Sequence, residues 1–211
     1  DFFQRGFKEI KITKAKNLNG FTDMNGVIAL KPEIAQNTID GINNIKNGKK
    51  TTFEQEKSIS TLHHELWHNA NKPGNMRMSK DETQTMELAN EFVSRKTLED
   101  FMKKLGGELQ NKELTESRTN TSYNKMVVNY DKLIKWSEAE PEKVVEDVKT
   151  SLVEEKYTEQ MKGLVSAIEK NSKYKIKAST IEALIGYAKK YDAETFDKLL
   201  EKNEKLRLER E

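Results

Sequence analysis

Cysteine is absent from the 211-residue chain, and no long apolar run occurs in it. Without cysteine there are no disulfides, thiolate zinc ligands or thiol nucleophiles, so any metal ion must be held by His, Asp or Glu. The same absence favours a reducing compartment, and we expect a cytoplasmic protein. No stretch approaches the ~20 apolar residues of a membrane helix, so we expect no membrane partner.

An excess of one charge sign is also lacking. The 37 Lys and Arg residues against 35 Asp and Glu residues leave a formal net charge of +2, and the two signs are interleaved along the chain. Because no basic stripe stands out, the sequence indicates no clear nucleic-acid binding. Hydrophobic residues make up 35% of the chain and are spread along it, which is typical of a folded, helix-rich protein and not of a disordered one.

The chain begins at Asp1 and not at Met, and no positively charged segment followed by an apolar run opens it as a signal peptide would. We therefore expect a domain or a processed product of a larger protein. The sequence pattern indicates no particular oligomeric state.

Strand character is predicted only in the first thirty residues. Residues 7–12 alternate in part between apolar and polar side chains, and residues 26–30 form a short apolar run. Asn25-Gly26 is a turn dipeptide, because both residue types tolerate positive φ. We expect a hairpin in which Phe21-Thr22 pairs with Val27-Ile28.

Helical periodicity covers most of the remaining chain. One helix is expected from Pro32 to about Asn47, and the next is capped by Thr51 or Thr52, with Glu54 and Glu56 in its acidic first turn. Further helices are predicted from about Asp81, through residues 98–105, and over residues 123–137, 141–156, 158–170 and 178–209, where residues 201–211 form a solvated helix end.

These elements predict an α+β fold, in which a small N-terminal β-sheet packs on the second helix and a mostly α-helical lobe follows. The helix predicted through residues 98–105 ends at the Gly106-Gly107 pair. We therefore expect a core domain over residues 1–106 and a helical C-terminal lobe over residues 107–211.

The second helix carries the motif HExxH as His64-Glu65-Leu66-Trp67-His68. Residues four apart lie on the same face of a helix, so the imidazoles of His64 and His68 can reach one ion. Zn²⁺ accepts His nitrogens at about 2.0 to 2.1 Å, and a catalytic site combines three protein ligands with one position for water. The motif therefore predicts a zinc site that needs a third ligand.

All three histidines of the chain fall within six residues, since His63 precedes the motif directly. Histidines that serve only as separate core or surface residues would not be expected to cluster in this way. The alternative interpretation is a polar helix face of His and Glu without an ion. We interpret His63 as structural or as a residue that supports a metal ligand.

The third ligand is expected to be a carboxylate. The sequence does not match the motif HExxHxxGxxH, which supplies a third histidine ligand, because Asn71 occupies its glycine position and Gly74 its third histidine position. Glu87 and Glu91 lie one turn apart on the following predicted helix. We expect Glu87 as the ligand and Glu91 as the acceptor of a hydrogen bond from a ligating histidine. Glu91 and Glu82 stay open as alternative ligands, as does a merely solvated acidic face.

Residues 60–68, STLHHELWH, followed by residues 87–92, ELANEF, resemble the gluzincin branch of zinc metallopeptidases. Within it, they are most similar to the compact ImmA/IrrE-like peptidases of bacterial mobile elements, with their T-L-x-HELxH helix and downstream E-x-x-A-N-x-F segment. The resemblance covers residues 20 to about 95. Two residues depart from the pattern. Met86 occupies the position three residues before Ala89, where the family often has its ligand glutamate. Trp67 replaces the small residue that is frequent before the second histidine. We expect Trp67 to pack against the C-terminal helices or to obstruct the cleft in part.

The resemblance implies a zinc-dependent metallopeptidase core over residues 1–106 that acts on a peptide or protein substrate. Zn²⁺ would be held by His64, His68 and Glu87. Glu65 would be the general base, which takes a proton from the metal-activated water and delivers it to the leaving amine. The family also implies a strand whose edge takes up an extended peptide, and Gly26 to Leu30 is either that strand or an interior one.

Several points stay open in the sequence alone. The C-terminal helices are interpreted as a lid, a plug or a second lobe. A catalytically silent zincin-like domain that binds metal or a protein partner is the alternative function, although metal binding alone does not require Glu65. A domain of a larger phage, plasmid or conjugative-element protein that acts on DNA-bound or host proteins is a third hypothesis. The candidates for stabilising an oxyanion are Tyr123, Tyr130, Tyr157 and Arg77.

Overall fold

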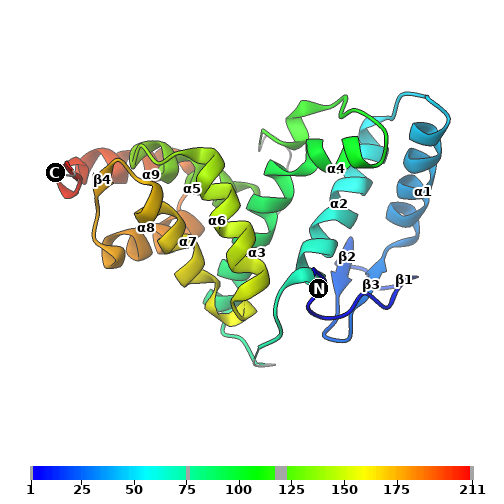
Figure 1. Ribbon diagram of the computed structural model, residues 1–211, viewed down its shortest axis with the longest axis horizontal. Coiled ribbons are helices and arrows are strands. Elements are labelled where there is room, and N and C mark those ends of the chain that lie inside the picture. Colours follow the sequence, from blue (N-terminus) through cyan, green and yellow to red (C-terminus); the bar gives the residue numbers. More distant parts are fainter. Residues whose placement is uncertain (1, 75–76, 117–122, 210–211) are drawn as a thin grey trace. The chain divides into compact units, whose positions relative to one another are not determined.

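Helices and a small N-terminal sheet make up the fold of the computed structural model (Figure 1). The structure describes residues 2–74, 77–116 and 123–209. A three-stranded sheet lies within the first thirty residues, and helices follow it. The predicted α+β class is therefore confirmed. No helix of the described residues has both the length and the apolar character that crossing a membrane requires.

The N-terminal sheet consists of β1 (Glu9–Ile12), β2 (Gly20–Thr22) and β3 (Val27–Leu30) in the order β1-β3-β2. β2 and β3 form the predicted hairpin, with Thr22 opposite Ile28. Gly26 turns the chain between them with φ of +78°. A Cβ there would meet the carbonyl oxygen of Gly6 at 1.6 Å, so only glycine fits.

β3 is the central strand and is buried along its whole length. β1 pairs with one of its edges in parallel and β2 with the other in antiparallel fashion. Because both edges of β3 already carry a neighbouring strand, an extended peptide cannot add to it. Of the two interpretations of residues 26–30, the edge strand is wrong and the interior strand is confirmed.

Two long helices follow the sheet, α1 (Pro32–Lys46) and α2 (Phe53–Ala70). Thr52, one of the two predicted caps, caps α2 through a capping box with Gln55. A Cβ at Gly41 of α1 would lie 2.9 Å from Cδ1 of Ile59, so this glycine permits the close packing of the two helices. Below them, Ile28 and Leu30 of the sheet share a core cluster with two helix residues, Ala35 and Leu62.

Helix α3 (Lys80–Lys96) starts within one residue of its predicted position. A capping box holds its first turn. The backbone N–H of Ser79 donates to Oε2 of Glu82 at 2.7 Å, and the backbone N–H of Glu82 donates to Oγ of Ser79 at 3.2 Å. Helix α4 (Leu98–Lys104) follows after Thr97.

The remaining helices are α5 (Asn124–Trp136), α6 (Pro141–Glu154), α7 (Gln160–Asn171), α8 (Ala178–Lys190) and α9 (Ala193–Lys202). Short 3₁₀ turns lie at residues 112–114, 157–159 and 204–206.

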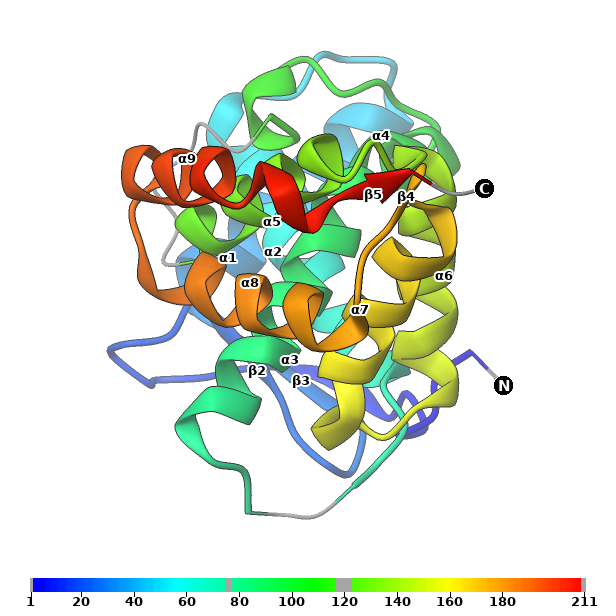
Figure 2. The ribbon, with the colours of Figure 1, turned by 90° about the vertical axis from the view of Figure 1, so that its left-hand side faces the viewer.

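The predicted helix over residues 178–209 is wrong. Asp192 starts a new helix, since its carboxylate accepts the N–H of Thr195 at 2.9 Å. After Lys202 the chain leaves the helix, and β5 (Leu208–Glu209) pairs with β4 (Tyr174–Lys175) (Figure 2). Strand structure is therefore not limited to the first thirty residues. The expected solvated helix end consists, up to residue 209, of the last residues of α9, a 3₁₀ turn and β5. Residues 210 and 211 lie outside the described part of the chain.

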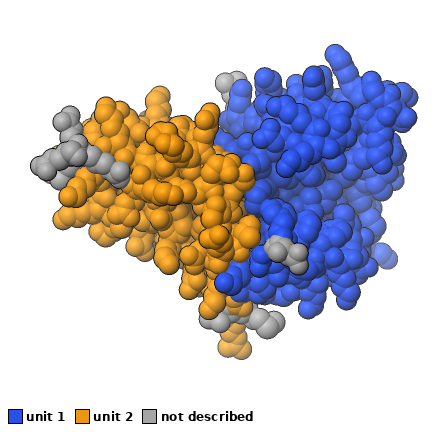
Figure 3. Space-filling model, viewed as in Figure 1, with its two compact units in different colours: residues 1–73, 93–119 blue, residues 74–92, 120–211 orange. Residues whose placement is uncertain are grey.

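Contacts group the chain into two compact units, residues 1–73 with 93–119 and residues 74–92 with 120–211 (Figure 3). The second unit buries the side chain of Lys189, whose ammonium group donates to Asp81 Oδ1 and to Thr85 Oγ1, each at 2.7 Å. This contact joins α8 to α3. The sequence-based division after residue 106 stays a prediction.

Glu56 connects α2 to the loop after α4. Its carboxylate is fully buried and accepts hydrogen bonds from the backbone N–H groups of Gln110 and Asn111, each at 2.8 Å. The hydroxyl of Thr51 and the side-chain amide of Asn111 donate to it as well. A charged group buried in this way needs such donors, because an unpaired buried carboxylate is strongly unfavourable.

We expect Glu56→Ala to lower the free energy of unfolding by about 3 kcal/mol, because two buried backbone N–H groups lose their acceptor. Urea unfolding followed by circular dichroism measures the change. Glu54→Ala is the matched control, since Glu54 lies in the same helical turn and is exposed. We expect that variant to stay within about 0.5 kcal/mol of the parent. Equal losses in both variants would contradict the role of Glu56.

Candidate metal site

His64 and His68 lie one turn apart on α2, with their rings 4.6 Å apart in a T-shaped arrangement. Their Nε2 atoms are 2.9 Å apart. Two nitrogens that bind one tetrahedral ion at 2.0 to 2.1 Å are about 3.3 Å apart. A small rotation of either ring therefore brings both nitrogens to the separation that a shared zinc ion requires.

Glu87 of α3 completes a group of three potential ligands. Among the described residues, one ligand atom each from His64, His68 and Glu87 lies within 4.8 Å of the others. Two imidazole nitrogens and one carboxylate oxygen are a donor set that zinc accepts at catalytic sites. The three residues that the sequence predicts as ligands thus fit a metal ion in type and in spacing, and the binding itself stays a prediction.

The two alternative carboxylates differ from Glu87. Glu82 holds the capping box of α3, and the backbone hydrogen bond from Ser79 lowers the pKa of its carboxyl group. Its side chain thus has a structural partner at the start of the helix. Glu91 lies one turn beyond Glu87 and is half-buried. Its expected role as an acceptor for a ligating histidine stays a prediction.

Glu65 is buried, with 5% of its surface exposed, and β2 lies against it. The hydroxyl of Thr22 is 2.7 Å from Oε2 of Glu65 and 2.9 Å from its backbone oxygen. A Cβ at Gly20 would lie 3.2 Å from Cγ of Glu65 and 2.9 Å from Cδ2 of Leu30. Glycine at one position and a hydroxyl at the other therefore let β2 approach and orient this carboxylate. The sequence contains no local signal for either contact.

His63 points into the core of the first unit. Its ring stacks on Phe101 at 4.3 Å, and its Nε2 lies 2.9 Å from Oγ1 of Thr97. Burial, together with the smaller effects of the nearby His64 and Lys104, lowers the pKa of His63 to about 3. The neutral ring therefore serves packing, in agreement with the structural interpretation of this residue.

Trp67 is buried against the N-terminal segment. Its ring meets that of Phe2 at 5.3 Å in a T-shaped contact, and its Nε1 donates to Nε2 of His63 at 3.3 Å. The bulky side chain at this motif position thus covers His63 on the side of α2 that carries residues 63 and 67. Nothing in the sequence near residue 2 predicts this contact.

The prediction of Tyr130 as a candidate oxyanion donor is wrong. Its side chain is fully buried in the second unit, and its hydroxyl donates to the backbone oxygen of Leu164 at 2.9 Å. Burial raises its pKa well above the ordinary value. Tyr157 is also buried, whereas Arg77 is exposed and Tyr123 half-buried. Their role stays a prediction.

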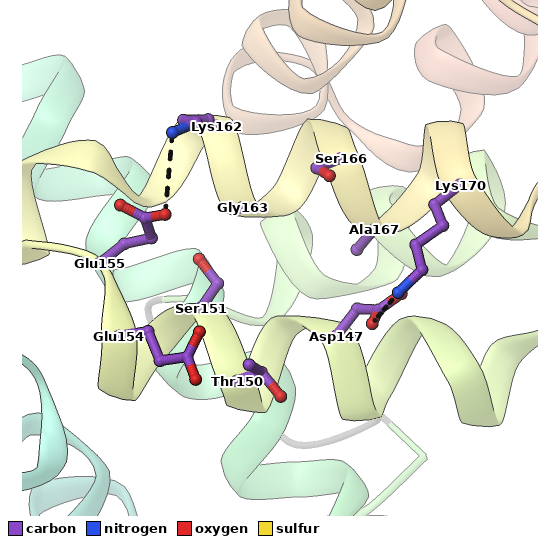
Figure 4. A pocket seen from close by; sticks show the side chains of 10 residues that line it. All are labelled: Asp147, Thr150, Ser151, Glu154, Glu155, Lys162, Gly163, Ser166, Ala167 and Lys170. Carbon is purple, nitrogen blue, oxygen red and sulfur yellow. Dashed lines mark hydrogen bonds and ion pairs between the residues drawn. The ribbon is translucent and has the colours of Figure 1, made fainter.

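A separate cavity of about 170 Å³ lies between α6 and α7 (Figure 4). Four of its charged side chains form ion pairs, Lys170 with Asp147 at 2.9 Å and Lys162 with Glu155 at 3.7 Å. Gly163 lies where a Cβ would collide with Oγ of Ser151. The ion pairs and this close helix contact explain the cavity as a feature of the packing of α6 on α7.

Comparisons of the chain with protein-family models, with curated proteins and with solved structures found no match. The motif and the geometry of its side chains are therefore the observations that bear on function.

Proposed function

We propose that the chain is a zinc-dependent metallopeptidase whose ion is held by His64, His68 and Glu87. The observation that carries the proposal is the convergence of one ligand atom from each of these residues within 4.8 Å. A buried glutamate directly after the first of them supports catalysis, because binding a metal alone does not require it. Zinc content and peptide cleavage, measured on the same protein, test the proposal.

Zn²⁺ in such a site lowers the pKa of the water that it binds to about 7 and polarises a carbonyl group. Glu65 is the general base. Its carboxylate accepts a proton from the attacking water and delivers it to the leaving amine. The burial of Glu65 and the hydroxyl of Thr22 limit the orientations of the carboxylate, so that the proton acceptor is held in place before the substrate arrives.

The substrate is a peptide or protein segment in extended conformation. β2 is an edge strand of the sheet and contacts Glu65 through Thr22. An extended peptide that adds to the open edge of β2 forms backbone hydrogen bonds that are independent of sequence. β2, and not residues 26–30, thus offers the strand edge that the family resemblance implies. The ImmA/IrrE-like motif supports a place for this domain in a larger bacterial or mobile-element protein.

We expect Thr22→Val to lower kcat for peptide cleavage about tenfold with little change in KM, because groups that orient a site residue typically contribute 10- to 100-fold. Valine keeps the shape of threonine and removes the hydroxyl that reaches Glu65. Thr22→Ser restores the hydroxyl and should recover most of the rate. Steady-state kinetics and zinc content of both variants provide the measurement. Equal kcat values for the valine and serine variants would contradict the role of the hydroxyl.

A further inference from the structure

β1 presents an apolar, open edge. All four of its residues are exposed, with Ile10 at 47% and Ile12 at 56% of their surface. β1 pairs with β3 on one side, and no strand of the described residues pairs with the other side. Open edges with exposed apolar side chains favour pairing with another chain.

The two isoleucines continue the buried face of the sheet. Ile10 lies opposite Ile28 and Ile12 opposite Leu30 in the parallel register of β1 and β3. Directly opposed residues of neighbouring strands point to the same face. Ile28 and Leu30 belong to the core cluster with Ala35 of α1. The apolar face therefore extends onto β1, where the helices no longer cover it.

The backbone groups of these isoleucines point to the open edge. The N–H of Thr13 donates to the backbone oxygen of Leu30 at 2.8 Å, so Thr13 faces β3. Successive residues of a strand direct their N–H and C=O groups to opposite sides. Ile10 and Ile12 therefore offer their donors and acceptors to an added strand.

We propose that a second copy of the chain pairs with this edge, β1 against β1 in antiparallel orientation, with the two-fold axis at Ile10. In this register Ile10 faces Ile10 of the second copy, and Glu9 faces Lys11 of the second copy twice by symmetry. Both ion pairs lie on the face opposite to the isoleucines. Isologous contacts of this kind are the usual way in which identical chains form dimers.

The neighbouring registers lack these pairs of opposite charge. An axis at Glu9 places two carboxylates opposite each other. An axis at Lys11 pairs Ile10 with Ile12 of the second copy but places two ammonium groups opposite each other. An axis between Ile10 and Lys11 places apolar side chains beside charged ones on both faces. Like charges directly opposite each other on a sheet are unfavourable, so the axis at Ile10 is the favoured one.

Sedimentation velocity over a rising concentration of the full chain tests the proposal. In this register three residues of each β1 face each other, which is a small interface, so we expect a dimer that forms only at high concentration. Glu9→Lys puts lysine opposite Lys11 twice and should weaken the dimer about tenfold. The charge-swapped variant Glu9→Lys with Lys11→Glu should restore the affinity of the parent.

The absence of cysteine allows a second measurement. Ile10→Cys places one thiol on each side of the two-fold axis, where a disulfide links two copies upon mild oxidation. Ile39→Cys is the matched control, because Ile39 of α1 is exposed to a similar degree, 53%. We expect covalent dimers of the first variant and not of the second.

A parent that stays monomeric at every concentration overturns the proposal. A dimer that Glu9→Lys leaves unchanged, or equal cross-linking of both cysteine variants, overturns it as well, since the two copies then meet through another surface. Circular dichroism shows that each variant is folded.

Discussion

Replacement of His68 by alanine is expected to remove bound zinc almost completely. The parent should hold about one zinc ion per chain, because three protein ligands form a single site. Without His68, one imidazole and one carboxylate remain, and this set is too small to retain the ion against dialysis. Elemental analysis of parent and variant, purified and dialysed in parallel, provides the measurement.

Variants of α3 serve as controls and identify the third ligand. Glu87→Gln should lose most of the zinc, whereas Glu82→Gln should keep it, because the side chain of Glu82 belongs to the capping box of the helix. Glu91→Gln tests the alternative that Glu91, and not Glu87, is the third ligand. Equal zinc in the parent and in the His68→Ala protein contradicts the site, and loss of zinc only in Glu91→Gln reassigns the carboxylate.

The Glu65→Gln variant is expected to keep its zinc and to lose at least about 100-fold in the rate of peptide cleavage. Glutamine preserves the size of the side chain and still accepts the hydroxyl of Thr22, but it cannot take up the proton of the attacking water. A peptide library prepared from a digested proteome, analysed by mass spectrometry for new termini, measures cleavage of many different peptide sequences at once.

The result of this assay also separates the two function classes. A zinc-loaded parent that produces no new termini favours the catalytically silent domain. Equal cleavage by the parent and by Glu65→Gln contradicts the general-base role, even where zinc is present. If Glu65→Gln loses both cleavage and zinc, Glu65 is needed for zinc binding, and the assay assigns it no role in proton transfer.

Features that depend on neighbouring residues were predictable. Thr52 and Gln55 form the capping box at the start of α2, and Asn25-Gly26 forms the turn between β2 and β3. The juxtaposition of His64 and His68 follows from the 3.6-residue period alone. Each of these contacts joins residues within a few positions, so local backbone geometry is sufficient to place them.

The break at Asp192 was also encoded locally. Aspartate is a strong cap residue, and Thr195 supplies the N–H that it accepts. Apolar periodicity continues on both sides of the break, which is why residues 178–209 are predicted as one helix. The pairing of β5 with β4 has no such signal, because it joins two-residue strands more than thirty positions apart.

Local residue patterns established the helix that carries the HExxH motif, the candidate ligand types on it and the hairpin beside it. Packing of distant segments decided the rest. It placed β1 beside β3, Thr22 against Glu65 and Phe2 against Trp67. It also brought Glu87 of the three candidate carboxylates to the histidine pair. The rotation of one helix toward another depends on many side-chain contacts between residues far apart in the chain, and no local pattern contains that information.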